Sequence, residues 1–174
     1  MKFKLGFLLI ISLFVASCTS IPQGIEPVKN FELNKYLGTW YEIARFDHSF
    51  EEGLEAVSAQ YSLLEDGGVS VTNRGFNPEE GEWEEAKGKA YFVDDESVGH
   101  LKVSFFGPFY SSYVIFFLDS RDYQYALVSG PNREYLWILS RDKNLPKSVV
   151  DMLITEASAA GYDTSKLIFV DHEQ

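Results

Sequence analysis

Three histidines and a stretch of carboxylates are the residues of this chain whose types suit proton transfer or metal binding. His48, His100 and His172 are far apart in the sequence, and no spacing among the His and Cys residues resembles a metal site. The carboxylates gather between Glu79 and Glu85, which is more typical of a solvated surface than of an acid–base pair. There is also no G-x-S-x-G turn and no phosphate-binding loop. We therefore expect neither an enzyme nor a metal site.

The single cysteine, Cys18, follows a segment typical of an export signal. An apolar run over residues 5–16 comes after two lysines and is shorter than the roughly 20 apolar residues that span a bilayer. Small residues directly before the cysteine resemble a bacterial lipobox, at which the signal is removed and the thiol carries a diacylglycerol. We expect residues 1–17 to be a signal peptide and Cys18 to be the lipidated N-terminus. The alternative is an ordinary cleaved signal with an incidental cysteine.

Thr19 bears on where such a lipoprotein is sorted. By resemblance to bacterial lipoproteins, a threonine rather than an aspartate after the cysteine favours the outer membrane, with the domain facing the periplasm. The net charge of −11 argues against nucleic acid as a partner and provides no attraction to anionic lipid. Membrane contact is therefore expected to come from the anchor. Residues 18–29, rich in proline and glycine, are expected to be a lipidated tether, and residues 30–174 one domain.

The domain reads as a run of short strands. Asn30 is expected to cap a short helix over residues 31–37 that ends at Gly38. Strand signals then recur at intervals of roughly ten residues, separated by turn residues such as Glu65-Asp66-Gly67-Gly68. The expected strands are Thr39–Asp47, Glu55–Leu64, Val69–Phe76, Glu85–Val93, His100–Phe106, Ser112–Leu118, Tyr123–Ser129 and Glu134–Ser140.

Eight consecutive strands without an intervening helix predict an all-β, antiparallel meander. Such a sheet removes its exposed edges by closing into an up-and-down β-barrel. A C-terminal α-helix should follow, with Pro146 at its first position and Gly161 after its end. Its apolar residues share one face, which predicts packing on the outside of the barrel. Leu167–Val170 is expected to be a short last strand.

Closure of the barrel would bring the first and eighth strands together. Gly38 and Trp40 begin the first strand, and Arg141 ends the eighth, so all three are expected at the same end of the barrel. A guanidinium there can stack on the indole, a contact worth about 0.5–2 kcal/mol, and donate hydrogen bonds to nearby carbonyl groups. We expect Gly38, Trp40 and Arg141 to be structural residues that close the barrel.

These motifs closely resemble the lipocalin family over nearly the whole exported chain. The resemblance rests on Gly38-Thr39-Trp40, on the run from Tyr135 to Arg141, and on the helix-then-strand ending. It is strongest to the bacterial outer-membrane lipocalins of the apolipoprotein D-like group. Two features depart from the family pattern: its second motif is present only as Asp119-Ser120-Arg121-Asp122-Tyr123, and the lone cysteine excludes an intramolecular disulfide.

The resemblance implies a binding cavity, or calyx, inside the barrel. Carried over residue by residue, the ligand-contacting positions fall on Tyr61, Asn73, Tyr113 and Trp137. Aromatic walls with a few hydroxyl and amide groups suit a small amphiphile, so the expected ligand is a fatty acid or lysophospholipid that the protein stores or transports. Arg74 should point outward by strand alternation.

Two other functions remain open from the sequence. In the first, the aromatic residues fill a closed core, and the protein is a structural or interaction lipoprotein. It would then pair with an envelope partner or with itself through the apolar loop Phe106–Tyr110, and a homodimer is compatible with either function. In the second, the barrel binds haem, as some lipocalins do, with His48 as the candidate ligand; otherwise no cofactor is expected.

Overall fold

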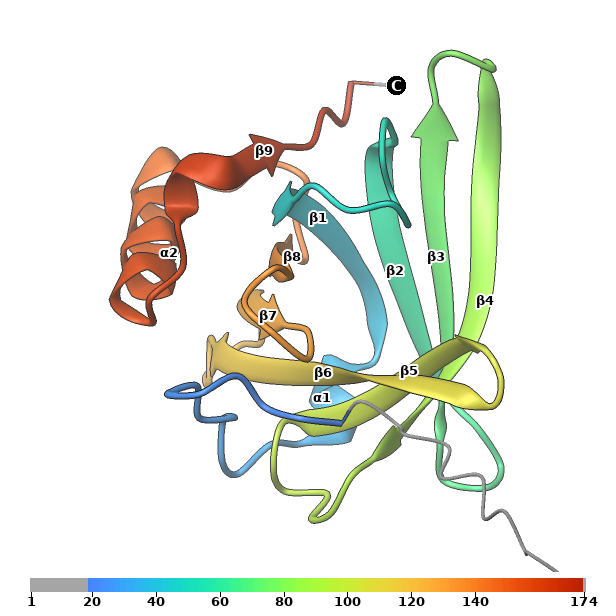
Figure 1. Cartoon of the computed structure of the whole chain (residues 1–174), viewed down its shortest axis with the longest axis vertical. Coiled ribbons are helices and arrows are strands. Elements are labelled where there is room, and N and C mark those ends of the chain that lie inside the picture. The colour runs from blue at the N-terminus through green and yellow to red at the C-terminus, as the bar shows by residue number, and fades with distance from the viewer. Residues whose placement is uncertain (1–18, 174) are drawn as a thin grey trace, which may run out of the picture.

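The computed structural model describes residues 19–173, so the expected signal peptide and Cys18 lie outside the described residues. Its strands form one antiparallel barrel that is closed by pairing of β1 with both β2 and β8 (Figure 1). The expected all-β, eight-stranded barrel with a C-terminal helix and a short last strand is therefore confirmed. The strands are β1 (Gly38–Phe46), β2 (Glu55–Leu63), β3 (Val69–Asn77), β4 (Glu82–Phe92), β5 (His100–Phe106), β6 (Phe109–Leu118), β7 (Tyr125–Ser129), β8 (Leu136–Ser140) and β9 (Leu167–Phe169).

Some strands are longer than the sequence pattern predicted. β4 begins at Glu82 instead of Glu85, because its ladder with β3 continues to the pair Asn77↔Glu82. β6 begins at Phe109 instead of Ser112, and Phe106 pairs directly with Phe109. The predicted apolar loop is thus the tip of a hairpin. β7 and β8 are shorter than predicted, since each begins two residues later.

The seam between β1 and β2 is closed by the C-terminal segment of the chain. β1 pairs with β2 only from Gly38 to Tyr41, and beyond that it pairs with β8 and β9. The segment after β9 then bridges the two strands: the Val170 amide donates to the Ile43 carbonyl (3.0 Å), and the Ala56 amide donates to the Asp171 carbonyl (2.6 Å). Backbone groups that would otherwise be unpaired at this opening are thereby satisfied.

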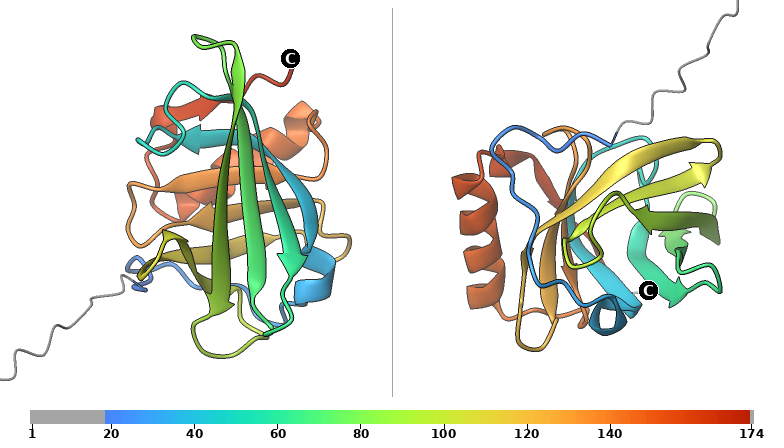
Figure 2. Two further views of the ribbon diagram at one scale, coloured as in Figure 1. Left: turned by 90° about the vertical axis from the view of Figure 1, so that its right-hand side faces the viewer. Right: turned by 90° about the horizontal axis from the view of Figure 1, so that it is seen from below.

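The long helix α2 (Lys147–Ala159) lies outside the barrel, on the side away from β3 and β4 (Figure 2). Its apolar face, which includes Leu153 and Ala157, is buried against the outer side of β1, β7 and β8. Gly161 follows with φ +89°, a left-handed conformation that ends a helix at little cost in a glycine. Pro146 is the N-cap, one position earlier than predicted.

The short helix α1 (Leu33–Tyr36) begins later than predicted. Its N-cap is Glu32, so the prediction that Asn30 caps this helix is wrong. Asn30 instead has φ +56°, a turn conformation that asparagine tolerates better than most residues. None of the helices in the described part of the chain is long and apolar enough to cross a membrane.

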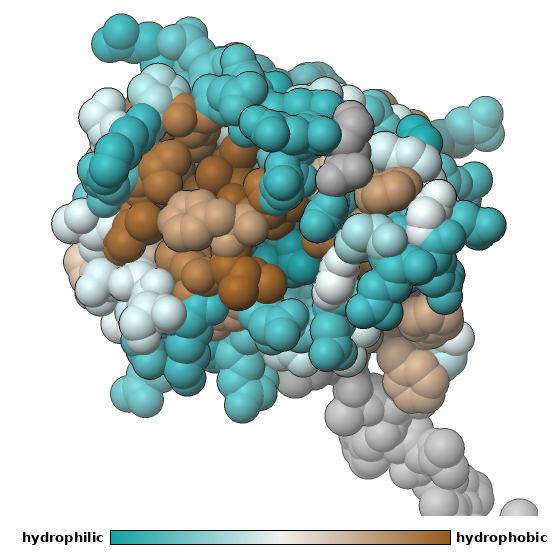
Figure 3. Space-filling model, turned by 90° about the horizontal axis from the view of Figure 1, so that it is seen from above, coloured by the Kyte–Doolittle hydropathy of each residue, from teal (hydrophilic) through white to brown (hydrophobic). Residues whose placement is uncertain are grey.

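Residues 19–29, which we expected to form a tether, pack against the barrel. Ile25 is buried in the cluster beneath α2. The Val28 amide donates to the Ile115 carbonyl, and the Gly99 amide donates to the Val28 carbonyl, both at 2.9 Å. The buried Ile25 side chain and these backbone hydrogen bonds hold the segment on the surface of the barrel. Figure 3 shows the molecule from above. The surface in this view is largely hydrophilic, apart from a recess in which apolar side chains gather.

Arg141 lies across the closed end of the barrel. Its guanidinium carbon is 4.1 Å from the centre of the Trp40 ring. It donates hydrogen bonds to five carbonyl groups, and the Trp40 indole donates to one of the same carbonyls, that of Tyr36 (2.8 Å). The five acceptors are the carbonyl oxygens of Lys35 (2.8 Å), Tyr36 (3.1 Å), Leu37 (2.8 Å), Thr39 (2.8 Å) and Tyr123 (3.3 Å).

Gly38 and Tyr123 complete this closed end. Gly38 has φ +97°, and a Cβ atom there would lie 3.3 Å from the Arg141 guanidinium, so both the backbone conformation and the available space favour glycine. Tyr123 ends the segment that we aligned with the second family motif. Besides accepting from Arg141, it accepts a hydrogen bond from the Glu32 amide at its hydroxyl group (3.0 Å). The Gly38-Thr39-Trp40 motif and the segment that ends at Tyr123 therefore both contact Arg141.

We expect Arg141→Ala to lower the free energy of unfolding by about 3 kcal/mol, because it removes several charge-assisted hydrogen bonds and leaves partly buried carbonyl groups unpaired. The measurement is chemical denaturation followed by circular dichroism. Lys143→Ala is the matched control, since that cation lies over the Tyr41 ring on the surface nearby. Equal stability of the two variants would contradict a closing role for Arg141.

Candidate functional site

The interior of the barrel is a cavity of about 500 Å³. All four residues predicted to contact ligand line it: Tyr61, Asn73, Tyr113 and Trp137. The rest of its wall is mainly apolar, contributed by inward-facing residues of the strands. The predicted alternative of a core packed shut is therefore contradicted by the structure, because a filled barrel would leave no space of this size.

Three tyrosines form a hydrogen-bonded chain at the deep end of the cavity. The Tyr113 hydroxyl lies 2.8 Å from that of Tyr36 and 2.9 Å from that of Tyr61. Burial raises the pKa of all three phenols, so the hydroxyl groups stay neutral. Tyr36 comes from α1 and was not among the predicted site residues. Its position just before the first strand gave no strand alternation from which to infer an inward orientation.

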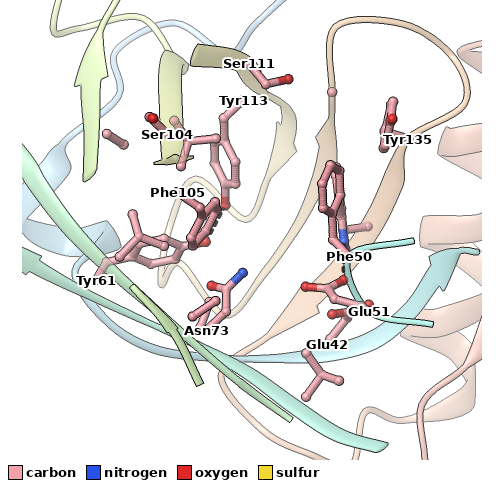
Figure 4. Close-up of a pocket in the computed structure, with 18 of the residues that line it drawn as sticks. Glu42, Phe50, Glu51, Tyr61, Asn73, Ser104, Phe105, Ser111, Tyr113 and Tyr135 are labelled. Carbon is pink, nitrogen blue, oxygen red and sulfur yellow. Dashed lines mark hydrogen bonds between the residues drawn. The ribbon is translucent and has the colours of Figure 1, made fainter. Parts of the chain in front are cut away.

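Asn73 on β3 carries its amide into the cavity (Figure 4). Its side-chain oxygen is buried and has no hydrogen-bond partner among the described residues. The next residue, Arg74, is exposed and its guanidinium carbon lies 4.2 Å from the centre of the Trp83 ring. The prediction that Arg74 points outward therefore agrees with its position, although it lies close enough to the open end to border the cavity.

Trp137 on β8 belongs to a polar cluster near the open end. Its indole donates to the Glu51 carboxylate (3.2 Å), and the same carboxylate oxygen lies 3.2 Å from Nε2 of His48. The His48 ring packs against Phe50, Tyr135 and Trp137. His48, the candidate haem ligand, thus lines the cavity with Nε2 directed at a carboxylate.

Glu42 and Arg45 on β1 complete this cluster. Their side chains are 4% and 2% exposed, and Nη1 of Arg45 lies 3.4 Å from the Glu42 carboxylate. Nη2 of Arg45 donates to the backbone carbonyls of Glu51 (2.6 Å) and Leu54 (3.2 Å), which holds the β1–β2 loop against the barrel. Figure 4 shows the carboxylates of Glu42 and Glu51 on the opposite side of the cavity from Tyr61 and Tyr113.

The pKa values of the two carboxyl groups in this cluster are shifted in opposite directions. Burial raises the pKa of Glu42 well above its ordinary value, and the nearby Glu51 raises it further, while Arg45 only partly offsets this. Burial also acts to raise the pKa of Glu51, but the adjacent His48 ring, the hydrogen bond from Trp137 and the charge of Arg45 outweigh it, so this pKa is lowered. A neutral Glu42 beside an ionised Glu51 avoids the cost of two like charges in one buried site.

Three residues of this cluster were not predicted from the sequence: Glu42, Arg45 and Glu51. Strand alternation from Trp40 does place Glu42 inside, so a signal was present for that residue. Arg45 carried no such signal, because a β-bulge between Glu42 and Ala44 adds one residue and reverses the alternation. Arg45 consequently pairs across the sheet with Trp137 and faces inward with it. Glu51 lies in a loop, to which no alternation applies.

Three phenylalanines stand at the open end of the barrel. Phe50 lies in the β1–β2 loop, and Phe106 and Phe109 form the tip of the β5–β6 hairpin. Their side chains are 70%, 77% and 67% exposed, and all three border the cavity. No group of His, Asp or Glu side chains in residues 19–173 is arranged to hold a metal ion.

The raised pKa of Glu42 predicts a specific dependence of stability on pH. The folded state favours the neutral carboxyl, so its contribution is fully present below the pKa of Glu42 in the unfolded chain and is lost as the pH rises toward the folded-state pKa. Relative to Glu42→Gln, the wild-type protein should therefore lose more than about 1 kcal/mol of unfolding free energy between about pH 4 and about pH 8. Denaturant titrations across this range measure the difference, with Glu52→Gln as an exposed control. A difference that does not vary with pH would refute the assignment.

Comparison with known proteins agrees with this geometry. A family model described as "Lipocalin-like domain" matches residues 31–172. The chain is 53% identical over 167 residues to the outer membrane lipoprotein Blc of Vibrio cholerae, covering 96% of this chain and 98% of the relative. It is 52% identical over 158 residues to Blc of Escherichia coli K12, with 90% and 89% covered. Apolipoprotein D of Macaca fascicularis is 33% identical over 165 residues, with 91% and 84% covered.

The solved structures show the same architecture. Insecticyanin from the tobacco hornworm Manduca sexta superimposes with a TM-score of 0.70 at 25% sequence identity, covering 87% of this chain and 86% of that chain. The matching domain model, the sequence relatives and the hollow barrel closed by Trp40 and Arg141 lead to one conclusion. This chain belongs to the lipocalin family.

Proposed function

We propose that this lipocalin binds a single-chain amphiphile, a fatty acid or a lysophospholipid, in its barrel and stores or carries it at the cell envelope. The observation that carries the proposal is the cavity of about 500 Å³ with its largely apolar wall. An acyl chain buried there gains about 0.8 kcal/mol per methylene group. Polar groups contribute the smaller part of the wall, and they include the tyrosine hydroxyl groups at the deep end and the His48 and Glu51 side chains near the mouth, which suits a ligand with a small polar part.

The protein is located at the outer membrane, as are the relatives named outer membrane lipoprotein. We further propose that residues 1–17 are removed, that Cys18 is acylated, and that the domain faces the periplasm. The motif before Cys18 and the following Thr19 support this proposal. Anchoring would keep the barrel next to a source of its ligand, since two or more acyl chains make membrane attachment stable.

The function proposed here is binding without turnover. The buried carboxyl groups Glu42 and Glu51 are engaged with Arg45, His48 and Trp137, which supports a binding role for them. The exposed Phe50, Phe106 and Phe109 favour a second role that is compatible with ligand binding, namely contact with an envelope partner or a second copy of the chain.

A variant that fills the cavity tests the proposed function. Val71 is buried on β3 and lines the cavity, so Val71→Trp should occupy the space of the ligand. We expect native mass spectrometry of the protein from cells to show a lipid-sized adduct on the wild type and little or none on Val71→Trp.

Thr72→Trp is the matched control, because it places the same side chain on the neighbouring residue of the same strand, which does not line the cavity. It should retain the adduct. Circular dichroism would establish that both variants are folded. Absence of any lipid adduct on the wild type, together with no uptake of a fatty acid or lysophospholipid in tryptophan-quenching titrations, would sink the proposed function.

A further inference from the structure

The three phenol hydroxyl groups at the deep end of the cavity have one more hydrogen than they can share. The Tyr113 oxygen lies 2.8 Å from that of Tyr36 and 2.9 Å from that of Tyr61, and each of these two hydrogen bonds uses one hydrogen. Three hydroxyl groups carry three hydrogens. No other acceptor in the described part of the chain is bonded to them. Whichever way the bonds run, one O–H donor therefore remains without an acceptor.

An acceptor without a donor lies on the same part of the cavity wall. The Asn73 side-chain oxygen is buried, and it has no hydrogen-bond partner among residues 19–173. Asn73 pairs with Ala59 and Tyr61 pairs with Val71, so Asn73 and Tyr61 are diagonal neighbours on the inward face of β2 and β3. Figure 4 shows the Asn73 amide on the same side of the cavity as the hydroxyl ends of Tyr61 and Tyr113. An unused donor and an unused acceptor thus share one region of the wall.

These two unused groups define the chemistry of a ligand group that would fit between them. Buried polar atoms are nearly always hydrogen-bonded, and an unpaired donor or acceptor destabilises the site. The neighbouring wall offers apolar side chains, among them Val69, Val71 and Leu101. An alcohol hydroxyl accepts from the phenol and donates to the Asn73 oxygen, whereas a carbonyl only accepts and a methylene group does neither. The pair therefore matches a hydroxyl group.

Given the lipid-binding function proposed above, on which this inference rests, we propose that Tyr36, Tyr61, Tyr113 and Asn73 form a deep polar subsite that receives a hydroxyl group carried on the acyl chain of the ligand. The barrel then binds lipids with a hydroxylated chain in preference to lipids with a plain chain. The subsite recognises the chain, and it lies across the cavity from the carboxylates of Glu42 and Glu51.

The deep subsite suits an uncharged group better than a lipid head group. Burial raises the pKa of all three phenols, so the subsite is neutral. A charged head group would lose its hydration there without gaining a counter-ion, because the Arg141 guanidinium lies over the Trp40 ring and is bonded to backbone carbonyls. A neutral hydroxyl has a smaller desolvation cost, which two hydrogen bonds offset. The head group therefore stays toward the mouth, and the chain brings its hydroxyl to the floor.

The test compares probes that share one head group and one chain length and differ only in a hydroxyl. Octadecanoate and its 2-hydroxy, 10-hydroxy, 12-hydroxy and 17-hydroxy derivatives are titrated below their critical micelle concentrations into the mature chain carrying Cys18→Ser, and calorimetry and tryptophan quenching report binding. We expect at least one of the 10-, 12- and 17-hydroxy probes to bind at least about fivefold more tightly than octadecanoate, because its hydroxyl pairs two unpaired groups. The 2-hydroxy probe keeps its hydroxyl beside the head group and should bind within about twofold of octadecanoate.

Removal of the acceptor assigns the preference to Asn73. Asn73→Leu should reduce the affinity ratio of the best hydroxylated probe to octadecanoate to about twofold or less, because the ligand hydroxyl would then have no acceptor. Octadecanoate measured on the same variant reports whether the cavity still takes up a chain. Thr72→Val is the matched control, since it removes a polar group from the neighbouring residue of the same strand, which does not line the cavity, and it should keep the wild-type ratio.

Removal of the donors assigns it to the tyrosines. A phenylalanine at either end of the hydrogen-bonded chain alone would still leave one spare hydrogen on the remaining two hydroxyl groups, so Tyr36→Phe, Tyr61→Phe and Tyr113→Phe are combined. The combined variant keeps the rings, leaves no phenol unpaired and should also bring the ratio to about twofold or less. Tyr91→Phe is the control, because that hydroxyl bonds to Asp66 at the surface and Tyr91 does not line the cavity.

The outcomes separate this inference from the proposed function. If octadecanoate binds and none of the 10-, 12- and 17-hydroxy probes binds more tightly, as when a trapped water satisfies both unused groups, the subsite is refuted while lipid binding stands. A wild-type ratio in both Asn73→Leu and the combined tyrosine variant would place the recognition elsewhere and also refute the subsite. If no probe binds, lipid binding in the barrel itself fails. Should one variant fail to take up octadecanoate, the other variant and the wild-type ranking decide.

Discussion

The stacking of one guanidinium on one indole is the contact on which the barrel's architecture depends. Arg141 leaves the last barrel strand and reaches five carbonyl groups of α1, the start of β1 and the β6–β7 link, while its face covers Trp40. The Arg141 guanidinium thereby links the end of β8 to the segment from α1 to the start of β1, about a hundred residues earlier in the chain. Because the closed end is sealed by this network, the interior above it can remain empty of side chains without opening the barrel to water from below.

A hollow interior requires stabilisation from elsewhere in the molecule. Residues around the cavity lack packing partners on one side, so they contribute less dispersion energy than residues of a filled core. The apolar cluster beneath α2, which lies between this helix and the outer face of β1, β7 and β8, supplies dense packing. The N-terminal segment around Ile25 and the C-terminal segment after β9 add to it by covering the outside and the β1–β2 seam. Stability and binding are thus assigned to opposite faces of the same sheet.

The position of buried charge distinguishes this cavity from a simple apolar pocket. Two carboxyl groups, an arginine and a histidine at one side of the mouth are costly to bury unless they are paired. Hydrogen bonds from Arg45 to Glu42 and to the β1–β2 loop offset this cost for the arginine, and Glu51 accepts a hydrogen bond from Trp137 and lies 3.2 Å from Nε2 of His48. The cluster therefore orders the β1–β2 loop and at the same time presents acidic groups to the cavity.

Strand alternation explains how much of the site was predictable. Tyr61, Asn73, Tyr113 and Trp137 lie on regular strands, where every second residue faces inward, so positions inferred from the family resemblance were placed in the cavity wall. Arg45 follows a bulge, Glu51 lies in a loop and Tyr36 lies in a helix. For these three residues the orientation depends on local backbone geometry that no periodic pattern encodes.

By itself, the sequence determined the strand count, the antiparallel order, the outer helix and the closing contact between Trp40 and Arg141, because turn residues, apolar periodicity and two distant motifs each carry local signals. Only the tertiary structure decided that the barrel is hollow, that residues 19–29 pack on its surface, and that Glu42, Arg45 and Glu51 share one buried cluster. The physical reason is that cavity volume and charge burial depend on long-range packing. Inward-facing residues of a given size fill a narrow barrel but only line a wider one, so the circumference decides whether a cavity remains. The bulge in β1 decides which side chains of that strand face the interior.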